Sequence, residues 1–222
     1  MKSVIEQLPR LLAAMERISI EVESSEGSFD LFCMFSVVRQ VINSKCMAGI
    51  NAISQLPMPS SGRSKEKKQS GSGTLRELVV NARNGTSSNI PGCIKRISLF
   101  SADNISLKFK KEKGKNGNSS GVITFDLTIE PGIEGQRDRS GNNNSFGFTV
   151  AIGTHKNSVL LSQKNIMMSI TQRQKFVRRE VTMQFDWNLA NSFGGVESGH
   201  IILRILSTDR RGMDVQYKVK LV

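Results

Sequence analysis

The sequence is poor in the residues that build covalent cross-links and metal sites. It has three cysteines and two histidines among 222 residues. Three cysteines cannot make a disulfide framework, and Cys33, Cys46 and Cys93 form no C-x-x-C pair of the kind that binds structural zinc. We therefore expect free, buried thiols and a reducing intracellular compartment, with no metal site.

Long apolar runs are missing too. The densest one, Leu31 to Val38, spans eight residues and contains Ser36, so it is too short for a transmembrane helix. Charged residues and Pro9 interrupt the first 21 residues, which excludes the apolar core of a signal peptide. The sequence therefore predicts a protein that is neither secreted nor transmembrane.

Catalytic and nucleotide-binding motifs are also absent. His155 and His200 each stand apart from any second histidine, cysteine or carboxylate at ligand spacing. The segment GKNGNSSG has the composition of a phosphate loop but not the G-x-x-x-x-G-K-[ST] order, and no G-x-S-x-G elbow occurs. We expect a protein that is not an enzyme and needs no cofactor. An enzyme whose site is assembled from residues far apart in sequence is the alternative.

Acidic residues are few compared with basic ones. The chain has 31 Lys and Arg against 19 Asp and Glu, a net charge of +12. Residues 1–30 nevertheless carry a net charge of −3, which leaves +15 for residues 31–222. An acidic arm on a basic body can dock onto its own body or onto that of a neighbouring copy. The basic excess favours an anionic partner: nucleic acid, an acidic membrane surface or an acidic protein.

The N-terminal part has the pattern of a helical arm. Residues 3–17 repeat apolar positions at helical spacing, residues 18–22 alternate as a short strand would, and a second helix is expected from about Ser28 to about Cys46. Residues 31–42 are apolar nearly all round, which is typical of a helix that is buried or covered by a partner. We expect self-association through these apolar side chains: Leu8, Leu11, Leu12, Met15, Leu31, Phe35 and Val38.

The composition changes after this arm. Residues 57–73 read PMPSSGRSKEKKQSGSG, which predicts a flexible basic linker or loop. Thr74 and Glu77 then have the spacing of a capping box, so we expect a short helix from this point to Arg83. The predicted parts of the chain are a helical N-terminal arm (1–56), the linker or loop (57–73), and a short helix with an antiparallel β domain (74–222).

From residue 95 onward apolar residues alternate with period two. The expected strands are 95–101, 105–109, 123–129, 146–152, 158–162, 165–171, 181–187, 200–207 and 215–221. Turns rich in Gly, Asn and Ser separate them. About eight or nine short strands predict an α+β, mainly β chain, in which residues 95–222 form an antiparallel β-sandwich or barrel after the N-terminal helical region.

Basic residues gather in several clusters. The candidates for binding nucleic acid or another anion are Arg63, Lys65, Lys67, Lys68, Lys108, Lys110, Lys111, Lys113, Lys115, Arg173, Lys175, Arg178, Arg179, Lys218 and Lys220. Positions i and i+2 of a strand lie on one face, roughly 6.5–7 Å apart, which is close to the spacing of phosphates. We therefore expect a phosphate-contacting ridge; lysines that protect an exposed sheet edge from pairing would produce the same pattern.

Aromatic residues make up only 6% of the chain. Stacking on single-stranded bases requires exposed aromatic rings beside basic residues, and Phe176 in KFVRR is the good candidate. Burial in the core is the role we expect for it. Binding should therefore be directed mostly at phosphates and have little sequence preference.

A small basic β-rich body, a helical arm of opposite charge, a Lys/Ser/Gly-rich loop and the missing catalytic set together resemble an RNA-virus structural protein of the matrix or coat kind. This resemblance is one of overall character. It implies a homo-oligomer that binds RNA or nucleocapsid, or acidic membrane lipid, in the host cytoplasm, the nucleus or the virion. Many coat proteins begin with an Arg-rich arm, and the acidic arm of this chain favours a matrix-like role instead. A sequence-nonspecific RNA-binding accessory protein, such as a viral movement protein or silencing suppressor, is the alternative.

Overall fold

The computed structural model describes most of the chain outside the predicted linker. The described residues are 2–21, 25–44, 74–85, 94, 97–111, 119–132, 144–170, 175–192, 200–208, 210 and 212–220. The helices are α1 (Lys2–Glu21), α2 (Ser28–Ser44), α3 (Leu75–Arg83) and α5 (Trp187–Ser192). The strands are β1 (Leu99–Lys111), β2 (Ser119–Glu130), β3 (Asn144–Thr154), β4 (Leu160–Ile170), β5 (Val177–Asp186), β6 (His200–Ser207) and β7 (Val215–Lys220). Among these residues, no helix is long and apolar enough to cross a membrane.

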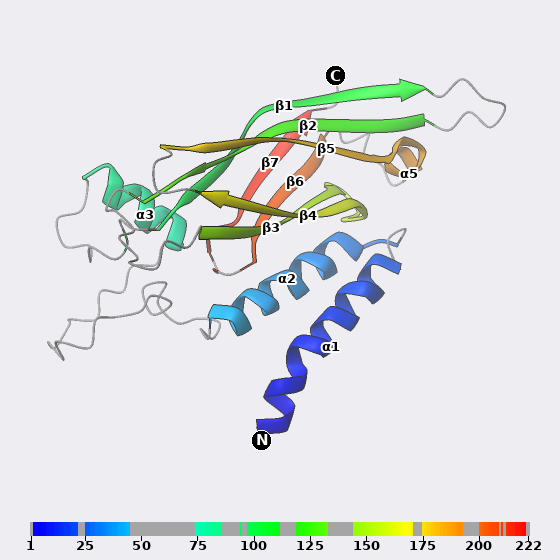
Figure 1. The fold of residues 1–222 in the computed structure, drawn as a ribbon. Coiled ribbons are helices and arrows are strands. Elements are labelled where there is room, and N and C mark those ends of the chain that lie inside the picture. Colours follow the sequence, from blue (N-terminus) through cyan, green and yellow to red (C-terminus); the bar gives the residue numbers. More distant parts are fainter. Residues whose placement is uncertain are drawn as a thin grey trace, which may run out of the picture.

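The strands form two antiparallel sheets (Figure 1). Sheet A has the order β1-β2-β5, and sheet B has the order β4-β3-β6-β7. The prediction of a mainly β chain of the α+β kind is confirmed. A closed barrel, one of the two predicted alternatives, is wrong for the described strands, because their pairing leaves two separate sheets.

One apolar core lies between the two sheets. In β2 the alternating residues Ile123, Phe125, Leu127 and Ile129 are at most 1% exposed, and they belong to one cluster with the alternate residues of sheet B. This is the burial that a period-two pattern produces when one face of a strand points inward. Packing of the inner faces therefore accounts for most of the buried apolar surface.

Hydrogen bonds join the sheets at both edges. On one side, the Arg179 guanidinium of β5 donates to the Met167 carbonyl of β4 at 3.0 Å. On the other side, the Ala102 amide of β1 donates to the Tyr217 hydroxyl of β7 at 2.8 Å. These bonds satisfy main-chain groups that the edge strands leave unpaired.

Several predicted strands are wrong in their bounds. The predicted segments 95–101 and 105–109 merge into β1, which starts at Leu99, and 158–162 and 165–171 merge into β4. In β1 the alternation is interrupted by a register shift between Asp103 and Ser106, where Asn104 has a φ of 52°. Asparagine tolerates this left-handed conformation, so the bulge breaks the sequence pattern without ending the strand. The described residues thus form seven strands, of six to 13 residues, where eight or nine short strands were predicted; β6 has the predicted bounds.

The predicted strand 181–187 ends one residue too late, and β5 begins four residues earlier than predicted, at Val177. The Asp186 carboxylate accepts hydrogen bonds from the main-chain amides of Asn188, at 2.8 Å, and Leu189, at 3.2 Å. Asp186 therefore caps α5, and Trp187 is helical although it continues the alternation of β5.

The predicted strand at residues 18–22 is wrong as well. Residues 18–21 continue α1, which runs without a break through Pro9. Ile18 lies seven residues after Leu11 and therefore continues the apolar stripe of the helix. An alternation over five residues is too short a pattern to outweigh this helical signal. The predicted second helix is confirmed as α2.

Helix α2 covers the outer face of sheet B (Figure 1). Phe29, Phe32 and Cys33 form a second apolar cluster with side chains of β3, β4 and β6. The Phe29 ring lies on Gly153 of β3, where a Cβ atom would overlap the ring. The Ser28 hydroxyl also accepts a hydrogen bond from the Leu160 amide at 2.8 Å. Helix α1 packs in turn against α2.

The predicted capping box is confirmed at the start of α3. The Thr74 hydroxyl accepts from the Glu77 amide, and the Glu77 carboxylate accepts from the Thr74 amide at 2.9 Å. Leu75 and Val79 of this helix are fully buried in the core between the sheets. The helix thereby places Arg76 and Arg83 at one end of sheet A.

Candidate binding surfaces

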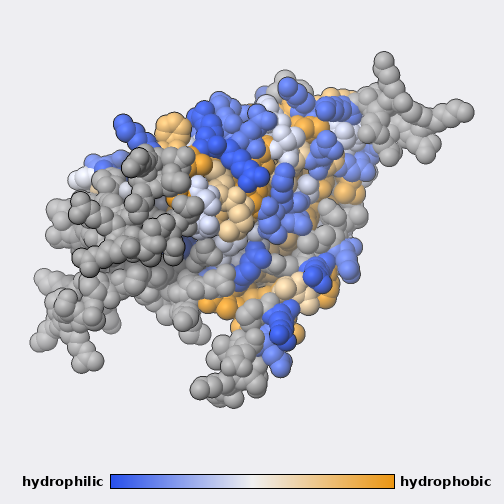
Figure 2. All heavy atoms as spheres, viewed as in Figure 1, coloured by the Kyte–Doolittle hydropathy of each residue, from blue (hydrophilic) through white to orange (hydrophobic). Residues whose placement is uncertain are grey.

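The α1–α2 hairpin exposes large apolar side chains. The described part of the chain has nine exposed large hydrophobic residues, and six of them belong to these two helices: Leu11, Met15, Ile18, Leu31, Met34 and Val38. Their spacing places three on one face of α1 and three on one face of α2. Figure 2 shows hydrophobic residues along the lower edge of the body, where Figure 1 places α2. We call these six side chains the hairpin face.

The residues predicted for self-association divide into two groups. Leu11, Met15, Leu31 and Val38 belong to the hairpin face, with exposed fractions between 36% and 53%. Leu12 and Phe35 are 6% exposed, so the chain itself covers them, and Leu8 is half-buried. Sequence reasoning missed Ile18 and Met34, which are 55% and 52% exposed; the helical spacing Leu11–Met15–Ile18 was the available signal for the first of them.

The turn between the two helices is acidic. Glu21, Glu26 and Asp30 are exposed around it. Asp30 lies 3.9 Å from the Arg204 guanidinium of β6, which also lies 5.2 Å from the centre of the Phe29 ring. The apolar stripes therefore end at a negatively charged tip on a chain of net charge +12.

The outer face of sheet A carries charges of both signs. Residues paired across antiparallel strands share a face, so Lys108, Lys110 and Arg178 all lie on it. Between the lysines and Arg178 lies a row of carboxylates, Asp103–Asp126–Glu180, one from each strand. Lys108 is opposite Val122 and Arg178 is opposite Thr128, six residues along β2, which corresponds to about 20 Å. The carboxylate row separates the two basic ends.

Hydrogen bonds hold these carboxylates in place. The Asp126 carboxylate accepts from the Asn104 amide group at 2.8 Å and lies 3.9 Å from the Arg178 guanidinium. The Asp103 carboxylate accepts from the hydroxyls of Thr128, at 3.2 Å, and Ser101, at 3.3 Å. Among the described residues, no group of three His, Cys, Asp or Glu side chains is arranged to hold a metal ion.

The remaining predicted basic residues do not join this face. Lys218 and Lys220 are paired with Ile202 and His200, which places them on the outer face of sheet B, on the side of α2. Arg179 reaches around the sheet edge to β4. The single ridge expected from the sequence is therefore divided between opposite faces of the two sheets.

The other candidates lie outside the described residues. These are Arg63, Lys65, Lys67, Lys68, Lys113, Lys115 and Arg173. Lys111 is the last residue of β1, but its side chain is also outside the described part. The predicted linker, residues 57–73, is likewise not described.

A polar groove lies at the end of sheet A next to α3. It has a volume of about 380 Å³ and is lined by Arg83, Asp103, Thr128, Glu130, Pro131, Lys175, Phe176 and Arg178. Three of these residues are sequence candidates for nucleic-acid binding: Lys175, Phe176 and Arg178. The others come from α3, β1 and β2 and have no sequence pattern that links them.

Phe176 is not in the core. It is 58% exposed, so the expectation of burial is wrong. It precedes the first residue of β5, where no partner strand or helix covers it among the described residues, and Val177 takes the half-buried position instead. Phe176 and Arg178 are two residues apart and line the groove together.

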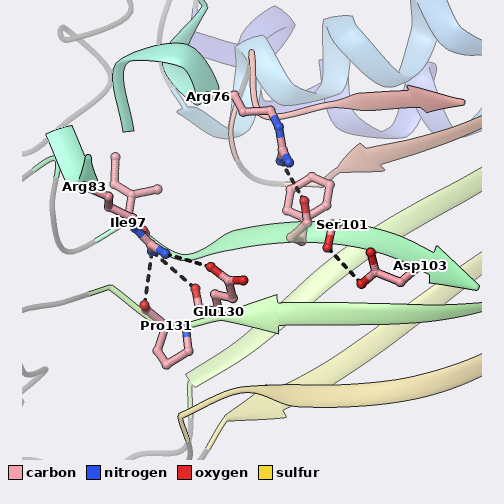
Figure 3. A network of polar contacts seen from close by, with 8 residues as sticks. Arg76, Arg83, Ile97, Ser101, Asp103, Glu130 and Pro131 are labelled. Atoms are coloured by element: carbon pink, nitrogen blue, oxygen red, sulfur yellow. Dashed lines mark hydrogen bonds and ion pairs between the residues drawn. The ribbon is translucent and has the colours of Figure 1, made fainter. Parts of the chain in front are cut away.

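Arg83 forms one wall of this groove (Figure 3). Its guanidinium donates to the carbonyls of Ile97, at 2.7 Å, and Pro131, at 3.1 Å, and lies 3.3 Å from the Glu130 carboxylate. Burial lowers the pKa of Arg83, and the Glu130 charge opposes that shift. The Arg83 side chain is therefore held in place in the wall of the groove, whereas the side chains of Lys175 and Arg178 are exposed.

A buried polar contact holds the end of α2 to sheet B. The Gln40 amide group, fully buried, donates to the Asp214 carboxylate at 2.8 Å and to the Ser207 carbonyl at 2.7 Å. Burial raises the pKa of Asp214 to about 6, although the bonds from Ser207 and Gln40 and the charge of Arg204 oppose the shift. Burial also raises the pKa of the Cys33 thiol.

The two histidines lie on different elements. His155 is exposed in the turn between β3 and β4, and His200 begins β6. A second cavity, of about 210 Å³, lies at the end of the core. Apolar residues and three serines line it, with Arg210 as its charged residue.

Comparisons with known proteins add little to this geometry. No protein-family model matches the sequence, and no curated protein matches it. Among solved structures, the chain is similar to β-glucosidase 3B from Thermotoga neapolitana in its complex with glucose, at 16% identity and a TM-score of 0.28. The match covers 56% of this chain and 16% of the glucosidase chain. The glycerol complex of the same enzyme matches at 17% identity with the same TM-score and coverage.

Proposed function

We propose that this chain is a non-enzymatic, self-associating basic structural protein, matrix-like in character, that uses a β-sandwich scaffold to present a helical hairpin. The hairpin binds a second copy of the chain, and the basic side chains bind RNA or nucleocapsid. The cell compartment that suits this role is a reducing, intracellular one. The observation that carries the proposal is the hairpin face.

Two features favour a second copy as the occupant of the hairpin face. Six of the nine exposed large hydrophobic residues of the described chain lie on the two helices, and apolar clustering of this kind marks protein–protein contacts. The acidic turn at Glu21, Glu26 and Asp30 is complementary to a body whose residues 31–222 carry +15. A second copy supplies both the apolar stripe and the basic partner surface.

A sequence-nonspecific RNA-binding accessory role is the second candidate function. It is favoured by the groove in which Phe176 is exposed beside Lys175 and Arg178. The two candidates differ in what the hairpin does: an accessory protein needs only a discrete monomer or dimer, whereas a structural protein needs an extending assembly.

The test replaces the centre of the hairpin face with charge. We expect the Leu11→Lys/Met34→Lys variant to lower the mass measured by light scattering toward that of one 24.5 kDa chain, because both side chains are about half exposed and their loss affects the contact more than the fold. Phe109→Lys is the control, since Phe109 of β1 is 51% exposed and belongs to sheet A, whereas α2 packs on sheet B. Equal masses for the double variant and the control would contradict the proposal.

A further inference from the structure

We propose that the groove at the end of sheet A is a binding site for one nucleotide of single-stranded RNA, with Phe176 as the stacking platform for its base. Lys175 and Arg178 are the cations that contact the flanking phosphates. This inference rests on the RNA binding proposed above, to which it adds the location and the mode of contact.

The argument starts from the position of the aromatic ring. Phe176 is 58% exposed and lines the groove together with two exposed basic side chains, Lys175 and Arg178. An aromatic face beside cations is the combination that single-stranded nucleic acids require, because bases stack on the ring while the cations neutralise phosphates. A polar groove of about 380 Å³ also has room for a group the size of a nucleotide.

A second exposed phenylalanine, Phe109 of β1, lacks this arrangement. Phe109 is 51% exposed and its sequence neighbours Lys108 and Lys110 are basic, but alternation along β1 places both lysines on the opposite face from the ring. The Phe109 ring also packs edge-on against Trp187, with 5.1 Å between the ring centres. The local sequences KFK and KFVRR look alike, yet only the second brings ring and cation to one groove.

The rest of the sheet limits where the strand can run. The carboxylate row Asp103–Asp126–Glu180 begins at the groove, which Asp103 itself lines together with Glu130, and lies between Arg178 and Lys108. Phosphates would therefore be repelled along the middle of the outer face. An RNA strand therefore contacts the end of sheet A without following β1 to its other end. This restricts the site to about one stacked base and its neighbouring phosphates.

The Arg83 wall of the groove is held in place by the chain itself. Arg83 is held by two carbonyls and by Glu130, and its side chain is 11% exposed (Figure 3). A wall fixed in this way loses little conformational freedom when a ligand is bound, which favours binding at a small site.

The experiment measures fluorescence anisotropy of a labelled oligoadenylate with the full chain. We expect Phe176→Ala to weaken binding roughly tenfold, because the base loses its stacking partner, and to leave the salt dependence unchanged because no charge is removed. Lys175→Ala should instead lower the slope of log affinity against log salt by about 0.7. Phe109→Ala is the matched control and should change the affinity less than about twofold.

Inorganic polyphosphate separates stacking from charge, because it carries phosphates without bases. Phe176→Ala should bind polyphosphate as the original chain does. If Phe176→Ala and Phe109→Ala bind oligoadenylate equally well, the groove is not the site, although RNA binding itself stands. If the original chain does not bind oligoadenylate at low salt, both RNA binding and the groove site are overturned. A loss that Phe176→Ala shows only on vesicles of phosphatidylserine and phosphatidylcholine would assign the ring to a membrane and overturn the nucleotide site.

Discussion

Two individual residues of the body help to fix α2 to sheet B. Gly153 leaves room for the Phe29 ring, and Asp214 receives the side chain of Gln40 at the other end of the helix. The Gly153 contact is apolar and tightly packed. The Asp214 contact is polar, and burial raises the pKa of its carboxyl group. Each can be tested by a single substitution.

Asp214 should make stability depend on pH. Burial raises its pKa in the folded chain from 3.8 to about 6, so the folded state binds this proton more tightly than the unfolded chain does. The contribution of Asp214 to the free energy of unfolding therefore falls as the pH rises from about 4 to about 6 and is lowest above that. We expect urea midpoints to rise more in the original chain than in Asp214→Asn when the pH is lowered from about 7 to about 5.

The control for this measurement is Gln184→Ala, which changes an exposed, uncharged side chain of sheet A. Its pH dependence should follow that of the original chain. If Asp214→Asn follows it as well, Asp214 does not carry the expected proton linkage.

Gly153→Ala should destabilise the chain by overpacking the Phe29 ring. A Cβ atom at this position would overlap a ring that is 1% exposed, and overpacking in a core costs about 1–3 kcal/mol. The free energy of unfolding in urea measures this cost. In a Phe29→Ala background the same substitution should cost much less, because the clash is gone; an equal cost in both backgrounds would show that Phe29 is not what Gly153 accommodates.

At the scale of elements, sequence patterns predicted the helices and strands in which the local signals agree with one another. The alternation of Ile123 to Ile129 predicted β2, and Thr74 with Glu77 predicted the start of α3. Predictions were wrong where a single residue, against the alternation around it, decides where a strand ends. The bulge at Asn104 joins two expected strands, and the Asp186 carboxylate turns Trp187 into a helical residue.

The binding surfaces were less predictable than the elements, because they depend on strand pairing. Asp103, Asp126 and Glu180 are far apart in sequence, and only the register of sheet A places them in one row. The groove likewise combines Arg83 of α3 with Glu130 of β2 and Phe176 before β5. Clusters such as KFKKEKGKNG give the number of basic residues but not the face on which each one lies.

At the scale of the whole molecule, the hairpin and the two-sheet body have different roles in the proposed assembly. The body holds α2 through Phe29, Phe32 and Cys33, which leaves the hairpin face outward. The basic residues are divided between the outer faces of the two sheets instead of forming one ridge. Association through the hairpin is therefore expected to be driven by apolar contact, with charge as a secondary contribution.

The mass of the full chain at low and at high salt tests this claim most directly. Apolar burial is not screened by salt, whereas attraction between exposed charges weakens beyond a screening length of about 10 Å at 0.1 M salt. We predict that light scattering gives a mass well above 24.5 kDa at both salt concentrations. A single-chain mass at low salt, or an assembly that dissociates to single chains when salt is added, would contradict the account.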